Sequence, residues 1–257
     1  MTETVERKSV RPPAYAARVE HLTKRFGSGP VVLDDISLAV EPGEFVCVLG
    51  ASGCGKSTLL ALMAGLETAG TGTVEVAGDR PALMFQEPAL LPWLTAAGNI
   101  ELALRLGGVP RKERRARAVE LLELVRLGGA ADQRPHQLSG GMRQRVALAR
   151  ALAQRSPVLL MDEPFAALDA ITRDVLHEEL LRVWRETGVS IVFVTHNVQE
   201  AVRLGQRVLL LSSRPGRVIR SWRVDLGDDR RIDSPAVGAL AGEITDRLRE
   251  EIRRHAA

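Results

Sequence analysis

"GASGCGKST", residues 50–58, follows the apolar run "FVCVL" at 45–49 and opens the helical pattern "KSTLLALMAGL" at 56–66. Glycines at a strand-to-helix junction let backbone N–H groups turn toward an anion, and the helix N-terminus adds a favourable partial charge. With this spacing, Lys56 would reach the β- and γ-phosphates of a nucleotide and the Ser57 hydroxyl would contact Mg²⁺. The predicted phosphate-binding residues are Gly50, Ala51, Ser52, Gly53, Cys54, Gly55, Lys56, Ser57 and Thr58.

Short apolar runs separated by helical patterns continue along the chain. They are "FVCVLG" (45–50), "PALMFQ" (81–86), "PVLLMD" (157–162), "SIVFVTH" (190–196) and "RVLLLSS" (207–213). Such strands predict a parallel sheet covered on both faces. Residues 16–26 and 33–40 instead alternate as in an antiparallel layer. We therefore predict an α/β fold of the P-loop NTPase class, with a RecA-like parallel sheet core and an antiparallel β layer.

Between the second and third core strands the strand signal disappears, and apolar residues recur at helical spacing. This pattern predicts an inserted helical subdomain at about 87–155, within a main domain at 15–224. The stretch "SRPGRVIRSWRVDL" (213–226) predicts a hairpin that turns at Pro215-Gly216. Residues 1–14 are expected to be flexible, and 225–257 to form an amphipathic helical tail.

Composition excludes several classes of protein. The chain has 257 residues, of which 26% are charged and 45% hydrophobic, values typical of a globular protein. No apolar run approaches the 18 or so residues of a membrane span, and the N-terminus does not resemble a secretory signal, so we expect a cytoplasmic protein. One Tyr, three Trp and five Phe are too few for a base-stacking platform. Nucleic acid is therefore not an expected partner.

Two local features carry weaker expectations. The net charge is +3, and basic residues gather at 105–117, which fits either a solvated helix face or proximity to anionic lipid. Cys47 and Cys54 cannot build a disulfide framework or a zinc site. Cys47 is expected to be buried in a strand, whereas Cys54 lies near a helix N-terminus, where a thiol tends to have a lowered pKa.

Two carboxylates end the strand "VLLMDE" (158–163), at the sheet edge where open α/β sheets bind their ligands. Asp162 is the expected Mg²⁺ ligand, directly or through water. Glu163 then remains as the candidate general base for an attacking water, although a solvated glutamate at a strand end is the alternative.

Polar side chains end two further core strands. His196 follows "SIVFVT", where it could approach a γ-phosphate, and Gln86 ends "PALMFQ", where its amide could contact Mg²⁺ or a metal-bound water. A lone histidine or glutamine is usually structural. The functional interpretation is favoured here because four strand ends carry phosphate-binding, metal-binding, basic or polar groups on one edge.

Taken together, these motifs resemble those of ATP-binding-cassette (ABC) ATPases. The phosphate loop, "FQEP" (85–88), "LSGGMRQR" (138–145), "LLMDEP" (159–164), "ALD" (167–169) and "TH" (195–196) occur in the order of that family. The resemblance implies an ATPase that uses ATP and Mg²⁺, with Phe26 stacked on adenine and Asp169 as the D-loop aspartate. The catalytic residues implied are Lys56, Gln86, Glu163, Asp169 and His196.

The segment "QLSGGMRQRV" (137–146) is a second helix start suited to an anion, although no lysine lies beside it. The resemblance implies a head-to-tail dimer in which Ser139, Gly140 and Gly141 complete the ATP site of the other subunit. It also implies transmembrane permease subunits as partners, coupled through "PALLPWLTAAGNI" (88–100), and an extracytoplasmic solute-binding protein that acts indirectly. The expected location is the cytoplasmic face of the cell membrane.

Three longer stretches resemble the ATPases of nitrate, sulfonate and taurine importers. They are "FQEPALLPWLTAAGNI" (85–100), "LLMDEPFAALDAITR" (159–173) and "LLLSSRPGRVI" (209–219). The departures are Phe26, where tyrosine is common, and Asn197, where an acidic residue is frequent. Aliphatic sulfonates are the first expectation for the solute, with nitrate or taurine next. An exporter or a non-transport ABC ATPase remains the alternative class.

Overall fold

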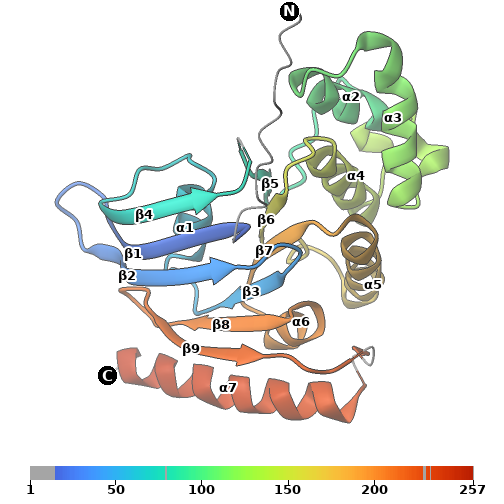
Figure 1. The fold of residues 1–257 in the computed structure, drawn as a ribbon. Coiled ribbons are helices and arrows are strands. Elements are labelled where there is room, and N and C mark those ends of the chain that lie inside the picture. The colour runs from blue at the N-terminus through green and yellow to red at the C-terminus, as the bar shows by residue number, and fades with distance from the viewer. Residues whose placement is uncertain (1–14, 79, 228–229, 232, 257) are drawn as a thin grey trace, which may run out of the picture.

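The computed structural model describes residues 15–78, 80–227, 230–231 and 233–256. Its larger sheet has six strands in the order β5-β6-β7-β3-β8-β9 (Figure 1). The bounds are β5 (Ala82–Met84), β6 (Val158–Asp162), β7 (Ser190–Thr195), β3 (Phe45–Leu49), β8 (Arg207–Leu211) and β9 (Val218–Arg223). Neighbouring strands are parallel except for the antiparallel β8–β9 hairpin. Its turn contains Pro215-Gly216 as predicted, but its first arm is the core strand β8 and lies outside the predicted stretch 213–226. The predicted α/β class is confirmed.

A second sheet has three strands in the order β2-β1-β4. Its strands are β1 (Ala17–Arg25), β2 (Val31–Val40) and β4 (Thr71–Val76). The predicted antiparallel layer is confirmed for β1 and β2, in which Val19 lies opposite Leu38. Strand β4 has no expectation from the sequence, because "TGTVEV" is short, half polar and only partly buried.

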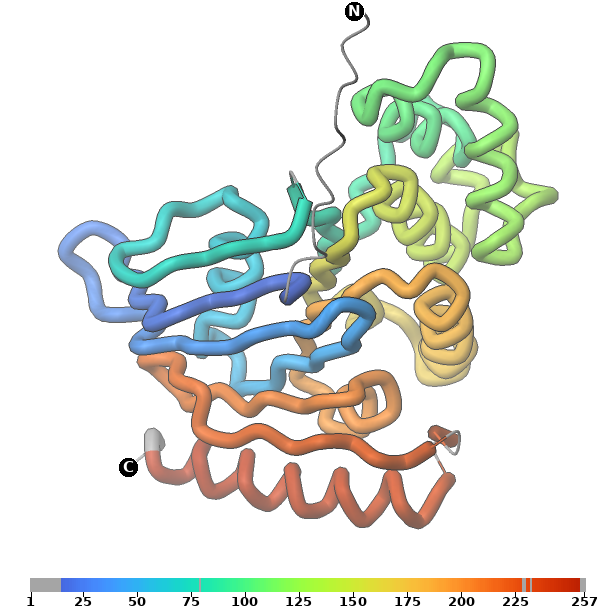
Figure 2. The backbone as a smooth tube through the Cα atoms, in the orientation of Figure 1, coloured from blue at the N-terminus to red at the C-terminus, as the bar shows by residue number. Residues whose placement is uncertain are grey.

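The described part of the chain also contains seven α-helices and two short 3-10 helices. They are α1 (Lys56–Met63), α2 (Ala96–Leu106), α3 (Arg111–Leu124), η1 (Gly128–Ala130), η2 (Pro135–Gln137), α4 (Gly140–Leu152), α5 (Ala170–Thr187), α6 (Val198–Leu204) and α7 (Pro235–Ala256). Residues 87–155, predicted to be a helical subdomain, contain α2, α3, η1, η2 and α4 and no strand. Figure 2 shows this helical region standing to one side of the two sheets.

The structure describes most of the predicted C-terminal tail but not the predicted flexible N-terminus. Helix α7 starts at Pro235 and runs alongside β9, so that the amphipathic tail is a helix from that residue onward (Figure 1). The predicted flexible segment 1–14 lies outside the described residues. None of the described helices is long and apolar enough to cross a membrane.

The central strand β3 explains why the phosphate loop is held firmly. Phe45, Cys47 and Leu49 belong to one buried cluster, whereas Val46 and Val48 belong to a second cluster shared with α1 and the small sheet. A fully buried side chain of this size contributes about 1.5–3 kcal/mol through the hydrophobic effect. The loop at 50–55 therefore leaves a strand that is packed on both faces.

Candidate nucleotide-binding site

The loop between β3 and α1 is shaped by its glycines. Gly53 and Gly55 have φ of 75° and 104°, a left-handed region that glycine enters without strain. A Cβ on Gly55 would come within 2.6 Å of Leu33 Cδ2. The buried Lys56 side chain folds back, so that Nζ donates to the carbonyls of Gly50 (2.9 Å) and Ala51 (3.1 Å). The loop thus surrounds a positive charge with its own backbone.

A cavity of about 370 Å³ lies in front of this loop, a size suited to a small ligand. Its lining contains Phe26, Pro30, Val31, Val32, Ser52, Gly53, Gly55, Lys56, Ser57, Thr58, Glu163 and Arg214. The structure therefore brings Phe26, the phosphate loop and Glu163 to one cavity. The Phe26 side chain is half exposed, and Lys24 Nζ lies 4.6 Å from the centre of its ring. The part of the ring that Lys24 leaves uncovered is available to a flat ligand.

Asp162 and Ser57 meet where β6 ends and α1 begins. Burial raises the pKa of Asp162 because it penalises the carboxylate, although a hydrogen bond from the Ser57 hydroxyl opposes this shift. A hydroxyl and a carboxylate are hard oxygen ligands of the kind that Mg²⁺ takes. A cation there would also offset the cost of the buried charge. The two residues therefore fit Mg²⁺.

The protein alone does not supply a complete coordination shell. Among the described residues, no group of three or more His, Cys, Asp and Glu side chains could hold a metal ion. Mg²⁺ commonly takes one or two protein ligands and completes its shell with water and substrate phosphates. This donor set accordingly favours Mg²⁺ bound together with a nucleotide.

Glu163 follows β6 and has contacts on both sides. Its Oε1 lies 3.8 Å from Lys56 Nζ, and its Oε2 lies 2.8 Å from His196 Nδ1. Its backbone N–H donates to Val194 O at 3.0 Å, and its φ of 44° is unusual for a residue with a side chain. Such strain persists only where the surroundings impose it. The carboxylate is thereby held between the lysine and the histidine.

A buried network supports the loop that carries His196, and the sequence analysis missed it. The Thr195 hydroxyl donates to the Glu200 carboxylate and accepts a hydrogen bond from Asn197 N at 3.0 Å. His177 Nε2 lies 2.7 Å from Glu200 Oε1. Helical spacing alone could not have related His177 on α5 to this loop, because the contact depends on how α5 and α6 pack.

Gln86 is not brought to the cavity. Its side chain is exposed, and its backbone carbonyl accepts a hydrogen bond from Gln144 Nε2 at 2.8 Å. This bond ties the end of β5 to α4 of the helical region. Gln86 is therefore placed at a junction between the sheet and the helices.

The Ser139–Gly141 segment also lies outside the cavity lining. Ser139 caps α4, where its hydroxyl accepts from Met142 N at 3.2 Å. A Cβ on Gly141 would come within 2.7 Å of Thr172 Cγ2, so this helix start packs closely on α5. Asp169 caps α5 through Thr172 N at 3.0 Å, and this hydrogen bond lowers the pKa of the aspartate. Within one chain, neither helix start reaches the nucleotide cavity.

The expectation that the pKa of Cys54 is lowered is wrong. Burial raises the pKa of the thiol, and this effect outweighs the opposing charge of Lys56. Only 1% of Cys54 is exposed. Cys47 is fully buried as predicted, and burial raises the pKa of its thiol well above the ordinary value.

Comparison with known proteins adds the family. A family model described as ABC transporter matches residues 33–166. Three relatives are similar over most of their length. A nitrate import ATP-binding protein of Synechocystis is 48% identical, covering 77% of each chain. A taurine import ATP-binding protein of Chromobacterium violaceum is 46% identical, covering 86% of this chain and 82% of the relative. An aliphatic sulfonates import ATP-binding protein of Albidiferax ferrireducens is 45% identical, covering 88% and 81%.

A solved structure shares the fold. It is described as the dimeric structure of a post-hydrolysis state of an ATP-binding cassette bound to ADP and Pi. The TM-score is 0.69 at 33% identity, and the match covers 81% of this chain and 99% of the other.

Proposed function

The chain belongs to the ABC transporter family, and we propose that it is the energy-coupling ATPase subunit of an importer for aliphatic sulfonates. As an ABC import ATP-binding protein it binds and hydrolyses ATP. The observation that carries the assignment of the site is the meeting of Lys56, Ser57 and Glu163 at one cavity.

The residues in and beside that cavity have separate roles. Phe26 stacks on the adenine, and the loop N–H groups together with Lys56 hold the β- and γ-phosphates. Ser57 and Asp162 hold Mg²⁺, which when bound neutralises charge on the phosphate oxygens. Gln86 would contact the metal or its water through its side-chain amide, which in this structure does not line the cavity.

Glu163 acts as the general base. It accepts a proton from the water that attacks the γ-phosphorus. The new bond to the water oxygen forms as the bond to the β–γ bridging oxygen breaks, so that ADP leaves and the γ-phosphoryl group becomes inorganic phosphate. His196, 2.8 Å from the same carboxylate, orients it and contacts the γ-phosphate. The proximity of Glu163 to Lys56 supports this role, because the base must stand next to the phosphate that the lysine holds.

The Ser139–Gly141 segment serves the ATP of a second copy of this chain. Ser139 is exposed at the start of α4, and this helix start does not line the nucleotide cavity of its own chain. A head-to-tail dimer would bring that helix start to the partner's γ-phosphate, with Asp169 beside it. The dimeric ABC cassette bound to ADP and Pi supports this arrangement.

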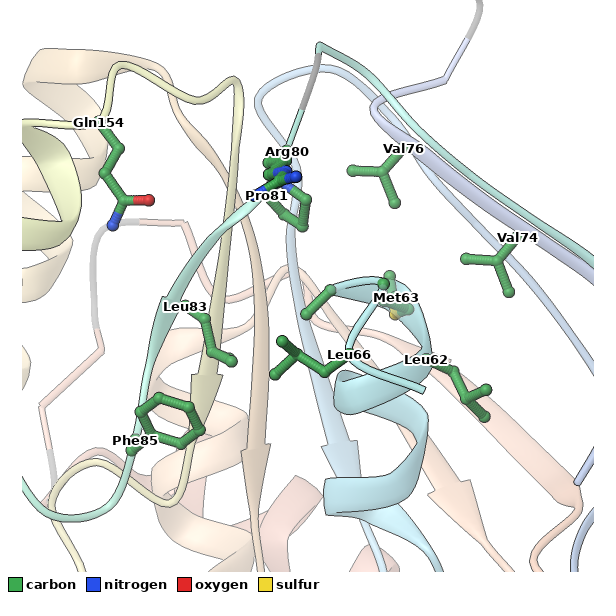
Figure 3. A pocket seen from close by; sticks show the side chains of 12 residues that line it. Leu62, Met63, Leu66, Val74, Val76, Arg80, Pro81, Leu83, Phe85 and Gln154 are labelled. Carbon is green, nitrogen blue, oxygen red and sulfur yellow. The ribbon is translucent and has the colours of Figure 1, made fainter. Parts of the chain in front are cut away.

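A second cavity supports a permease partner. It measures about 660 Å³ and is lined mainly by apolar side chains of α1, β4, β5 and the residues just after α1 and β5, among them the exposed Leu66 and Phe85 (Figure 3). Phe85 directly precedes Gln86, and Trp93 nearby in sequence is two-thirds exposed. We place an apolar segment of a transmembrane subunit here, at the cytoplasmic face of the membrane. A solute-binding protein would act on the far side of that permease.

The names of the relatives support a sulfonate as the solute. Taurine is itself an aminoalkane sulfonate, so the taurine and aliphatic sulfonate importers handle the same anionic group. Nitrate is the second candidate, because a nitrate import relative has comparable identity.

Growth of a strain that lacks this chain tests the solute. We expect the strain to grow on sulfate but not on ethanesulfonate as sole sulfur source, and the full chain, but not its Lys56→Ala variant, to restore growth. Normal growth on ethanesulfonate and taurine would remove the sulfonate assignment. A growth defect seen only with nitrate as the sole nitrogen source would identify nitrate as the solute instead.

A further inference from the structure

An arginine from the far end of the chain reaches the phosphate loop. Arg214 lies between β8 and β9, and its Nε donates to Gly53 O at 2.8 Å. It lines the same cavity as Lys56 and Glu163. A Cβ on Gly53 would come within 2.9 Å of Arg214 Nη2, so the guanidinium lies directly over the loop.

The turn that carries Arg214 is fixed in place on two sides. Gly216 N donates to Val32 O, and Asp34 N donates to Gly216 O, both at 2.9 Å. A Cβ on Gly216 would come within 2.2 Å of Cys54 O, so the turn rests on the backbone of the phosphate loop. Figure 1 shows the β8–β9 turn lying beside the start of β2. The position of Arg214 is therefore set by the fold.

Arg214 differs from Arg217, a neighbour in the same turn, in whether a carboxylate pairs with its guanidinium. The Arg217 guanidinium pairs with Asp34, at 3.0 Å from Nε. Arg214 is exposed and, within the part of the chain that the structure describes, has no carboxylate partner. Its Nη groups remain available in a cavity that takes a triphosphate. Arginine recognises phosphate oxygens with several N–H groups of fixed geometry.

We propose that Arg214 binds the triphosphate of ATP in its own chain, as a second cation beside Lys56. This inference rests on the proposed nucleotide site and adds to it a residue outside the loop. The Nε bond to Gly53 orients the guanidinium, and the Nη groups contact the phosphate oxygens. The β8–β9 turn thereby joins Phe26 and the phosphate loop in forming the nucleotide site.

The test is equilibrium dialysis of the full chain with radiolabelled ATP in EDTA, where hydrolysis is absent. Arg214→Gln should bind ATP about tenfold more weakly than the parent chain, as expected for loss of charge-assisted hydrogen bonds. Arg214→Lys, which keeps the charge, should lose only about twofold to threefold. Arg223→Gln, an exposed arginine of the same hairpin, is the matched control and should bind like the parent.

Displacement by inorganic tripolyphosphate identifies the part of ATP that is contacted. Arg214→Gln should weaken the binding of tripolyphosphate by the same factor as the binding of ATP. The difference in affinity between the variant and the parent should shrink as the salt concentration is raised. If the variant lost affinity for ATP but not for tripolyphosphate, the proposed contact between Arg214 and the phosphates would be wrong. A lower melting temperature with equal losses in the Gln and Lys variants and no change in salt dependence would reduce Arg214 to a clamp on Gly53. If the parent and Arg214→Gln bind ATP equally well, the role of Arg214 is wrong but the proposed nucleotide site stands. If the parent does not bind ATP, the proposed nucleotide site itself is wrong.

Discussion

His196 Nδ1 lies 2.8 Å from Glu163 Oε2, although the two residues are 33 positions apart in the chain. They meet because β6 and β7 are neighbours in the sheet and each residue directly follows its strand. The carboxylate is also 3.8 Å from Lys56 Nζ. The carboxylate proposed as the base therefore lies within reach of both the histidine proposed to orient it and the lysine proposed to bind phosphate.

Replacing Glu163 by Gln should leave ATP affinity unchanged and lower the hydrolysis rate about a hundredfold or more, the scale expected when a general base is lost. The amide keeps the size of the side chain and can still accept a hydrogen bond. Phosphate release and nucleotide binding are measured on the same preparation. Glu178→Gln, an exposed position on α5, is the matched control. Hydrolysis at the parent rate would show that Glu163 is not the base.

Replacing Asp162 by Asn should stabilise the Mg²⁺-free chain at neutral pH. Burial raises the pKa of Asp162 above its ordinary value of 3.8, so the folded chain binds this proton more readily than the unfolded chain. The stability of the parent therefore falls as pH rises from the ordinary pKa through the raised one, because the carboxylate is ionised only at the cost of its burial.

Thermal unfolding from pH 7.5 downward measures this effect. The gain of Asp162→Asn should diminish as pH falls below the raised pKa, because the parent side chain then becomes neutral too. Asp225→Asn, an exposed position, should show no such gain. Mg-ATP should stabilise the parent more than the Asn variant. A destabilised Asn variant in EDTA would contradict the cost assigned to the buried carboxylate.

Cys54 should react slowly in the folded chain. Its thiol is 1% exposed and burial raises its pKa, so both access and the thiolate fraction are low. A Cys47→Ala chain, in which Cys54 is the sole thiol, should label with maleimide at pH 7 at least about tenfold more slowly when folded than in urea. Mg-ATP should slow labelling further, because it occupies the loop.

A Cys54→Ala chain, which reports Cys47 alone, should be still less reactive, since that thiol is fully buried in β3. Rapid labelling of folded Cys54 at pH 7, unaffected by nucleotide, would mean that the loop opens readily.

Mixing two inactive chains tests whether the Ser139–Gly141 segment acts on the partner's ATP. Lys56→Ala removes the phosphate-binding cation, and Ser139→Arg places a bulky side chain at the α4 start. If the segment acts across a dimer, the mixed dimer has one site with both changes and one with neither. Single-turnover hydrolysis should then return in the mixture, and each chain alone gives the baseline. No recovery, with subunit exchange verified independently, would mean that the segment serves its own chain's ATP or that hydrolysis requires two intact sites.

The sequence by itself determined the parts of this protein that depend on neighbours along the chain. The phosphate loop follows from glycines and a lysine at a strand-to-helix junction, because backbone conformation is set locally. The alternation of apolar runs and helices likewise predicted the α/β class. The carboxylates of Asp162 and Glu163 could be assigned to the sheet edge because they end a buried strand.

The tertiary structure decided what depends on residues distant in sequence. Strand order brought His196 to Glu163, and helix packing brought His177 to Glu200, neither of which has a local signal for the contact. The environment of Cys54 was predicted wrongly because the helix start is local, whereas its burial comes from an apolar cluster shared with Leu33 and Leu211. Arg214 could not be assigned to the site either. Its placement over Gly53 exists only because the β8–β9 turn rests on β2 and on the phosphate loop, so the physical reason is long-range backbone contact rather than any pattern of residues.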